Sequence, residues 1–186
     1  MISKKNTFYA MVIIFFCILG FFLYLNIRKN KIEIENSISH LDTTYIENTN
    51  NKKNYKIKSY YYDSGLSVEG GIISAYLDDN SIKIIEGGYS GETFLQDYDF
   101  YFESKSSFLL KDIFQQFDRP YSEKGRIQIK KETNKYYFIN LKMVRWTDTQ
   151  GQTVDYYSYK FKKKEQEILN QLDNILNVIN TEKPIR

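Results

Sequence analysis

Three patterns of apolar and polar residues follow one another along this chain of 186 residues. The first is an almost unbroken apolar run from Phe8 to Leu25, inside a stretch from Asn6 to Ile27 without a charged residue. The second repeats apolar residues at helical spacing, and the third alternates aromatic and β-branched residues with polar ones, as strands do. The changes predict an anchor, a connecting helix and a sheet-rich domain.

The apolar run predicts one membrane-spanning helix, because about 20 apolar residues cross a hydrocarbon layer of about 30 Å. We assign residues 1–7 to a short N-terminal tail and residues 8–27 to a transmembrane signal anchor in contact with the lipid bilayer. A cleaved signal peptide is the alternative, although the run is longer than a signal core and no small-residue cleavage pattern follows it. Cys17, the only cysteine, is interpreted as an apolar side chain of the run.

The flanks of the apolar run bear on orientation. Basic residues lie on both sides of it, so the charge rule is nearly balanced. A short tail before a single anchor and a large domain after it favour an N-in, C-out arrangement. We therefore expect a bacterial cell membrane protein with a periplasmic or extracellular C-terminal domain.

Residues 28–54 predict a membrane-proximal helix followed by a linker. Apolar residues recur here at helical spacing, and the Asn/Lys-rich stretch 48–54 is expected to end the helix. His40, the only histidine, is interpreted as a solvated surface residue of this helix. The segment from Ile32 to Tyr45 is able to pair with a second copy, which leaves a homodimer open.

Residues 55–182 predict an α+β domain. Four stretches read as aromatic strand, polar turn and apolar strand, and they begin at Tyr61, Tyr76, Tyr101 and Tyr137. We interpret them as successive hairpins of one antiparallel, twisted β-sheet. The segment Lys164 to Asn180 carries an apolar stripe at helical spacing, so it is expected to pack on the sheet as a C-terminal helix.

Aromatic residues dominate the predicted strands. Rings at alternate positions are expected to share the face under the helix: Tyr98, Phe100, Phe102, Tyr136, Phe138, Tyr157, Tyr159 and Phe161. The other rings point the opposite way, and the 17 Tyr against 13 Phe favour rings that tolerate a wet edge. The candidate binding surface consists of Tyr61, Tyr101, Tyr137, Trp146 and Tyr156. The alternative is that the twisted sheet wraps these rings into its own core.

The net charge of +3 does not indicate a nucleic-acid partner. Residues 1–31 hold five basic and no acidic residues, which leaves 21 basic against 23 acidic residues in the rest. The segment from Tyr60 to Glu103 is mainly acidic and that from Arg119 to Arg145 mainly basic. We interpret the two as sheet halves that attract one another, with a patch for an anionic ligand as the alternative.

The inventory of reactive side chains predicts no catalytic, cofactor-binding or metal site. With one histidine and one cysteine, both near the anchor, neither a nucleophilic dyad nor a zinc site can be assembled. The pairs Asp78-Asp79 and Asp97-Asp99 are typical of turns and strand edges. The stretch 87–93 (GGYSGET) lacks the lysine of a phosphate-binding loop and predicts a loop with positive φ. An enzyme would be marked by a cleft lined by carboxylates of raised pKa.

The hairpins at Tyr60 to Val68, Ala75 to Glu92 and Glu132 to Asp148, followed by a helix, carry a resemblance. The chain resembles a loose group of small uncharacterised exported bacterial proteins with repeated YYF-type hairpins, and is weakly similar to Tyr/Gly hairpin repeats of the MORN type. The resemblance implies an exported, sheet-rich domain and brings no assigned activity. We therefore expect a single-pass membrane-anchored, non-enzymatic envelope protein that acts by binding a protein partner or as a structural component. A glycan or peptidoglycan-binding module that uses exposed Tyr and Trp is the alternative.

Overall fold

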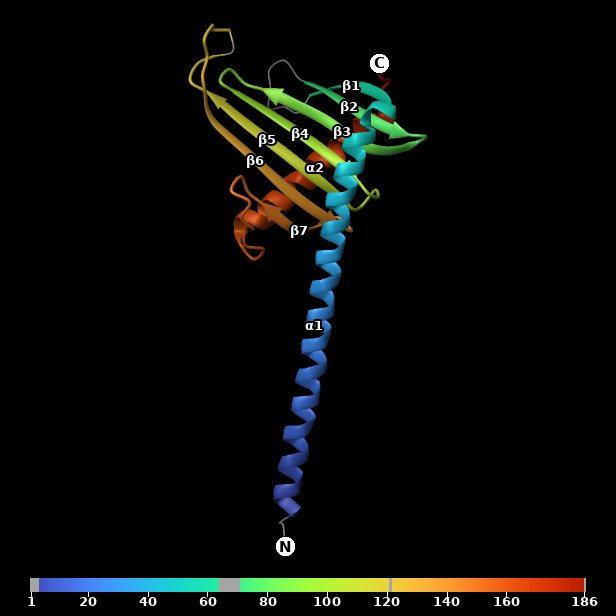
Figure 1. Ribbon diagram of the computed structural model, residues 1–186, viewed down its shortest axis with the longest axis vertical. Helices are drawn as coiled ribbons and strands as arrows, with labels where there is room; N and C mark the ends of the chain where they lie inside the picture. The colour runs from blue at the N-terminus through green and yellow to red at the C-terminus, as the bar shows by residue number, and fades with distance from the viewer. Residues whose placement is uncertain (1–3, 64–70, 121, 186) are drawn as a thin grey trace. The chain divides into compact units, whose positions relative to one another are not determined.

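A computed structural model describes residues 4–63, 71–120 and 122–185, with side chains from Leu19 onward. The described residues form two α-helices and one seven-stranded antiparallel sheet, so the predicted α+β class is confirmed (Figure 1). Helix α1 spans Lys4–Asn51 and leads into the 3-10 turn η1, Lys52–Asn54. The remaining elements are β1 (Lys56–Tyr62), β2 (Gly71–Asp78), β3 (Ser81–Ser90), β4 (Phe94–Phe102), β5 (Phe108–Phe117), β6 (Gln128–Ile139), β7 (Lys142–Thr147) and α2 (Tyr159–Thr181).

The chain divides into two units, Met1–Ser39 and His40–Arg186. The first unit is the N-terminal part of α1, where apolar side chains between Leu19 and Ile27 are exposed. Among the residues that the structure describes, no helix has both the length and the apolar character needed to span a membrane. The predicted transmembrane helix over 8–27 is therefore not supported, and the side chains of its residues 8–18 lie outside the described ones.

The prediction that the helix ends within residues 48–54 is confirmed, since α1 ends at Asn51, but the helix continues through Asn48 at the start of that stretch. The buried side chain of Asn48 explains this, because its amide donates to the carbonyl oxygens of Lys83 (3.3 Å) and Phe102 (3.4 Å). Its side-chain oxygen accepts a hydrogen bond from the hydroxyl of Tyr55 at 2.9 Å. These tertiary contacts outweigh the weak helix propensity of asparagine.

The seven strands are ordered in the sheet as they are in the sequence, each antiparallel to the next. The hairpins expected from Tyr76, Tyr101 and Tyr137 are confirmed. Between β6 and β7 the two turn residues Asn140 and Leu141 have φ values of 51° and 60°, the conformation that two-residue hairpins need. The predicted strand residues after the first turn, 66–68, lie outside the described part of the chain.

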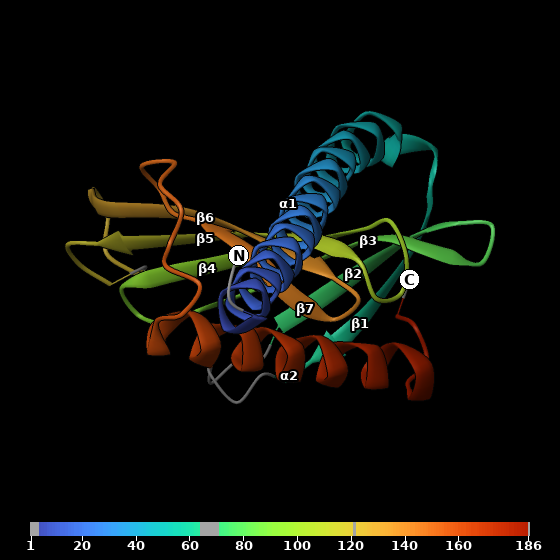
Figure 2. The ribbon, with the colours of Figure 1, turned by 90° about the horizontal axis from the view of Figure 1, so that it is seen from below.

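Helix α2 lies across one face of the sheet (Figure 2). Its buried side chains Phe161, Ile168, Leu172 and Ile175 pack on rings that include Phe100, Phe108 and Phe138. The expectation that rings of β4 and β6 face this helix is confirmed. Phe161 also lies in this core, but Tyr157 and Tyr159 are exposed and residues 157–161 do not form the expected strand. The hydroxyl of Ser158 accepts a hydrogen bond from the backbone N–H of Phe161 (3.2 Å) and begins α2 there.

The opposite face of the sheet is covered by residues 40–51, the part of α1 that belongs to the second unit. Leu41 is fully buried, and the ring of Tyr45 meets that of Tyr101 edge-on at 4.7 Å. The hydroxyl of Tyr137 donates to the carboxylate of Asp42 at 2.9 Å. His40 is exposed, as predicted, with its Nε2 3.2 Å from the carboxylate of Glu103. The domain therefore buries both faces of its sheet.

Both outer strands of the sheet make hydrogen bonds beyond the seven-strand ladder. At β1 the backbone N–H of Ile185 donates to the carbonyl oxygen of Ser59 at 2.8 Å. At β7 a bridge joins Thr147 to Thr153, and the N–H of Val154 donates to the carbonyl oxygen of Trp146 at 2.9 Å. Residues that follow α2, or lie just before it, thus cover part of each edge.

Candidate functional site

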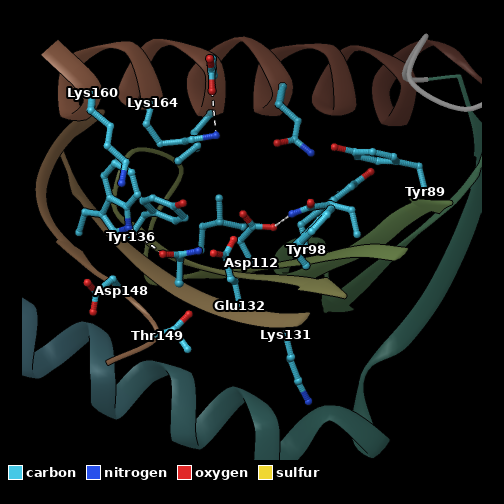
Figure 3. A pocket seen from close by; sticks show the side chains of 18 of the residues that line it. Tyr89, Tyr98, Asp112, Lys131, Glu132, Tyr136, Asp148, Thr149, Lys160 and Lys164 are labelled. Carbon is cyan, nitrogen blue, oxygen red and sulfur yellow. Dashed lines mark hydrogen bonds and ion pairs between the residues drawn. The ribbon is translucent and has the colours of Figure 1, made fainter. Parts of the chain in front are cut away.

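A cleft of about 1130 Å³ opens between α2 and the sheet (Figure 3). Tyr98, Asp112 and Tyr136 line it from strands β4, β5 and β6, and Lys160 and Lys164 reach toward it from α2. Tyr89 of β3 lies at one end of the view, and Lys131 points away from α2. The cleft therefore lies within the second unit, under the helix that was predicted to cover the aromatic face.

The sequence of α2 explains why a cleft remains beside it. The apolar stripe of α2 sits on the core, while a second stripe at helical spacing lines the cleft with polar side chains: Lys160, Lys164, Glu167, Gln171 and Asn174. The apolar side of α2 packs on the sheet, and the adjacent polar side does not. A cleft therefore remains between the polar side and the sheet.

Asp112 lies where an apolar residue would be expected. It occupies the helix-facing row of β5, directly opposite Tyr98 of β4 and Asn134 of β6. The side-chain amide of Gln96 donates a hydrogen bond to its carboxylate, and Asp112 forms no ion pair with any residue in the described ranges. Burial raises the pKa of Asp112 to about 6; the hydrogen bond from Gln96 and the charge of Lys164 oppose the rise.

The hydroxyl of Tyr98 is the second unusual group. The residue is only 2% exposed, and its hydroxyl makes no hydrogen bond to any part of the chain that the structure describes. Gln171 of α2 is near enough to act against the rise in the pKa of Tyr98 that burial causes, but it is not placed for a hydrogen bond. A buried hydroxyl without a partner costs about 1–3 kcal/mol, so such groups are rare unless something else satisfies them.

Gly87 allows the Tyr98 ring to lie where it does. The two residues are cross-strand neighbours, and a Cβ at Gly87 would lie 2.7 Å from atoms of the ring. The prediction of a positive-φ loop at 87–93 is wrong for its first residues, since Gly87 and Gly88 are inside β3. Among the described residues, the glycines with positive φ are Gly125 and Gly151.

Three of the lysines that line the cleft already have partners, Lys130, Lys160 and Lys164. Lys164 pairs with Glu167 at 2.8 Å, and Lys130 pairs with Glu132 at 2.9 Å. Lys160 lies over the ring of Trp146, 4.5 Å from its centroid. On the floor, within the part of the chain that the structure describes, Asp112 has no ion pair and the hydroxyl of Tyr98 has no hydrogen bond.

The structure does not assemble the predicted binding surface. Tyr61 is 72% exposed and Tyr156 is half-buried, but Tyr101, Tyr137 and Trp146 are buried. The expectation of exposure is wrong for these three, because helices cover both faces. Tyr101 and Tyr137 lie under α1, whereas Trp146 lies on the α2 side and lines the cleft.

Sequence reasoning missed Tyr98 and Asp112 as site residues. A signal was present, since alternate residues of β5 read Phe108, Leu110, Asp112, Phe114, a single acid in an apolar row. In a strand with one face on the core, such a break places a charge among apolar side chains. No aspect of the sequence indicated that Tyr98 would lack a hydrogen bond.

The face under α1 also carries charge, arranged as a connected network. Glu86, Asp99 and Lys111 lie side by side in one row across β3, β4 and β5. Lys52 pairs with Glu86 at 2.5 Å, and the hydroxyl of Tyr76 donates to Glu86 at 2.9 Å. Burial, followed by the charge of Glu86, raises the pKa of Asp99 to about 6. The basic partners here are Lys52 and Lys111, which lie outside the segment Arg119 to Arg145, so the expected attraction between the two sheet halves stays a prediction.

Metal binding finds no support, because the described residues contain no group of three or more His, Cys, Asp or Glu side chains able to hold an ion. Searches with this chain match no protein-family model, no curated protein and no solved structure. The site must therefore be interpreted from its own geometry.

Proposed function

We propose that this protein is a membrane-anchored, non-enzymatic binding protein of the bacterial cell envelope, and that its domain binds a ligand in the cleft under α2. The observation that carries the proposal is a pair of incompletely satisfied groups, the buried hydroxyl of Tyr98 and the half-buried carboxylate of Asp112, on the floor of a cleft of about 1130 Å³. The lining of this cleft combines aromatic rings with many polar side chains, and a concave pocket in which polar groups converge is typical of ligand sites. The ligand is either a group that belongs to an envelope protein partner or a free small molecule.

The anchor part of the proposal rests on the sequence of α1. Residues 6–27 carry no charge, and the helix runs without interruption from Lys4 to Asn51. An uncharged helical stretch of this length suits a bilayer, and the side chains from Leu19 to Ile27 are exposed and mostly apolar. We propose that the C-terminal domain lies outside the cytoplasm.

Binding is favoured over catalysis by the state of the other carboxylates. Asp112 has the raised pKa that would mark an enzyme, but acid–base chemistry between two carboxyl groups needs a second one free to act. Glu132 and Glu167 each make an ion pair with a lysine. Asp148 accepts hydrogen bonds from the backbone N–H groups of Gln150 and Gln152.

Glycan binding is the second candidate function, and the cleft lining favours it. Amide side chains of Gln96, Asn134, Gln171 and Asn174 lie in the same cleft as the rings of Tyr136 and Trp146. Amides that pair with sugar hydroxyls beside rings that stack on sugar faces are a common combination. A titration with chitotriose and with peptidoglycan fragments tests this candidate, and a flat titration at millimolar sugar removes it.

The binding function can be tested by obstructing the cleft. Asn174 lines the cleft, whereas Asn177, one turn further along α2, is exposed outside it. We expect ligand-observed NMR on the full chain in micelles to find fragments that bind the wild type and Asn177→Phe but not Asn174→Phe. Fragments that bind all three proteins equally, or the absence of any that bind, would contradict the proposal.

Topology is tested with a cysteine in the β4–β5 turn. Lys105→Cys suits this purpose because Lys105 is exposed, whereas the neighbouring Ser104 hydroxyl accepts two backbone hydrogen bonds of the turn. Labelling by a membrane-impermeant maleimide on intact or outer-membrane-permeabilised cells is the expected result. Labelling only after full lysis would place the domain in the cytoplasm.

A further inference from the structure

We propose that the cleft recognises a primary alkylammonium group, which lies on the aromatic floor with Asp112 as its counter-ion. This inference rests on the proposed binding function and adds the chemical class of the ligand. Its basis is the placement of one unpaired carboxylate among rings.

Three rings surround Asp112 on the helix-facing side of the sheet. Tyr98 lies directly opposite it on β4. On β6, Tyr136 lies two residues beyond Asn134, which is the direct neighbour of Asp112. On β5 itself, Phe114 lies two residues beyond Asp112. Directly opposed side chains have Cβ atoms about 5 Å apart, and diagonal neighbours are within reach of aromatic rings. The faces of aromatic rings attract cations, so the rings and the carboxylate favour the same kind of ligand.

The hydrogen-bonding capacity of the floor matches an ammonium group. A primary ammonium has three N–H donors and no acceptor. The carboxylate of Asp112 uses part of its capacity for Gln96, and the buried oxygen of Tyr98 has no partner among the described residues. The carboxylate of Asp112 can accept from an ammonium group with its remaining capacity, whereas the hydroxyl of Tyr98 lies toward Tyr89 and is available to a separate polar group of the ligand.

Charge argues against an anionic ligand. Lys130, Lys160 and Lys164 are engaged with Glu132, the Trp146 ring and Glu167, and Lys131 points away from α2. An anion would have to displace these contacts while it approached Asp112. A neutral ligand would leave the Asp112 carboxylate buried without a counter-charge, which is costly.

The pH dependence of binding follows from the surroundings of Asp112. The titratable groups that act on it or are acted on by it are Tyr89 of β3, Asp97 of β4, Glu132 and Tyr136 of β6, and Lys164 of α2. Glu167 of α2 faces the same cleft and acts on Tyr89 and Tyr136. Because the pKa of Asp112 is about 6, the carboxylate is mainly ionised at neutral pH and mainly protonated one unit below its pKa. The affinity for an ammonium group should therefore fall about tenfold between about pH 7.5 and about pH 5.

The ammonium group has two sources, a lysine side chain of a polypeptide or a free amine. The test therefore uses acetyl-Gly-Lys-Gly-amide and spermidine as probes, with acetyl-Gly-norleucine-Gly-amide, butanol and chitotriose as uncharged probes. Trp146, the only tryptophan of the chain, lines the cleft and reports occupancy through its fluorescence emission. The titrations are made on the full chain in nanodiscs.

The expected result is saturable change of the Trp146 emission by an ammonium probe, in the wild type and in Asp99→Asn, and at least tenfold weaker binding by Asp112→Asn. Asp99 is the matched control, since its pKa is also raised to about 6 but it lies on the opposite face. The pH dependence of the wild type tests the inference even if a variant does not fold.

The outcomes separate the two proposals. Stronger binding of the lysine peptide identifies a polypeptide as the source, and stronger binding of spermidine identifies a free amine. Saturation by chitotriose or the norleucine peptide with equal affinity, or unchanged binding by folded Asp112→Asn, overturns the ammonium inference and leaves the binding function standing. No response to any probe, together with no cleft-dependent fragment, overturns both.

Discussion

On the face of the sheet under α1, the buried phenol of Tyr137 donates to Asp42, and Tyr76 donates to Glu86. On the face under α2, the buried phenol of Tyr98 has no partner among the described residues, and Asp112 has only the neutral amide of Gln96. The two faces have similar aromatic rows and similar carboxylates. They differ in whether the chain itself supplies hydrogen-bond partners for the buried polar groups. The face whose polar groups are paired stabilises the fold, whereas we expect a ligand on the face whose polar groups lack partners.

The largest effect should come from the contacts that seat each helix. Leu41→Ala, under α1, and Leu172→Ala, under α2, each remove a buried leucine and should lower the free energy of unfolding by about 2–5 kcal/mol. Chemical denaturation of the full chain in micelles measures both. If both helices are structural parts of one domain, the losses are similar; a negligible loss for Leu41→Ala would mean that α1 is not needed to close its face.

The two buried carboxylates should respond differently to neutralisation. The folded pKa of Asp112 and of Asp99, about 6, lies above the ordinary value of 3.8, so the folded protein binds protons more tightly between these values. The contribution of these two carboxyl groups to the free energy of unfolding is therefore most favourable below about pH 4, and it is lost as the pH rises through about 6. Asp112→Asn should raise stability at about pH 7.5, by on the order of 2 kcal/mol, and flatten this loss.

Asp99→Asn should give a smaller gain than Asp112→Asn, because Lys111 and Lys52 act against the rise in the pKa of Asp99. Thermal unfolding between pH 4 and pH 8 compares the two variants under the same conditions. Equal gains would show that Lys111 and Lys52 do not stabilise the ionised carboxylate of Asp99.

Removal of one hydroxyl from each face sharpens the comparison further. Tyr137→Phe breaks a hydrogen bond to a carboxylate and should cost about 1.5 kcal/mol. Tyr98→Phe breaks no hydrogen bond and removes an unsatisfied polar atom, so the stability of the unliganded protein should stay equal or rise. Denaturation midpoints measure both changes, and a loss at Tyr98 as large as that at Tyr137 would show that its hydroxyl is satisfied in solution.

The smallest expected effect concerns the start of α2, which carries the lysines of the cleft. Ser158→Ala removes the side chain that accepts from the N–H of Phe161 and should cost about 1 kcal/mol. Hydrogen exchange should be faster in the first turn of α2 and unchanged in α1. Exchange that rises equally in both helices would contradict this local role.

The sequence predicted the elements that depend on local pattern. Alternating rings identified β4 and β6, and the turn residues Asp79 and Asn140 marked two hairpins, because a strand face and a tight turn each need particular residues close together in the chain. The apolar stripe of residues 168–176 identified the core-facing side of α2 for the same reason. The start of α2 was missed because Ser158 as a cap is a single short-range hydrogen bond.

The site could not be predicted because its features arise from packing between distant segments. Tyr101 and Tyr137 were expected at the surface, and they are buried because residues 40–51 lie on them. Asn48 continues a helix, against its propensity, through contacts with strands more than 30 residues away. Whether the hydroxyl of Tyr98 finds a hydrogen-bond partner depends on the position of α2, and the residue pattern of a strand does not predict that position.

The hydrogen bond from Ile185 to Ser59 and the bridge from Thr153 to Thr147 bear on how the protein behaves when crowded. A sheet of seven strands ends in two rows of backbone groups that can template the addition of foreign strands and thereby start aggregation. Here short segments of the same chain occupy part of both rows. A protein concentrated by attachment to a surface would benefit from such protection, and deletion of residues 182–186 should make β1 prone to self-association in solution.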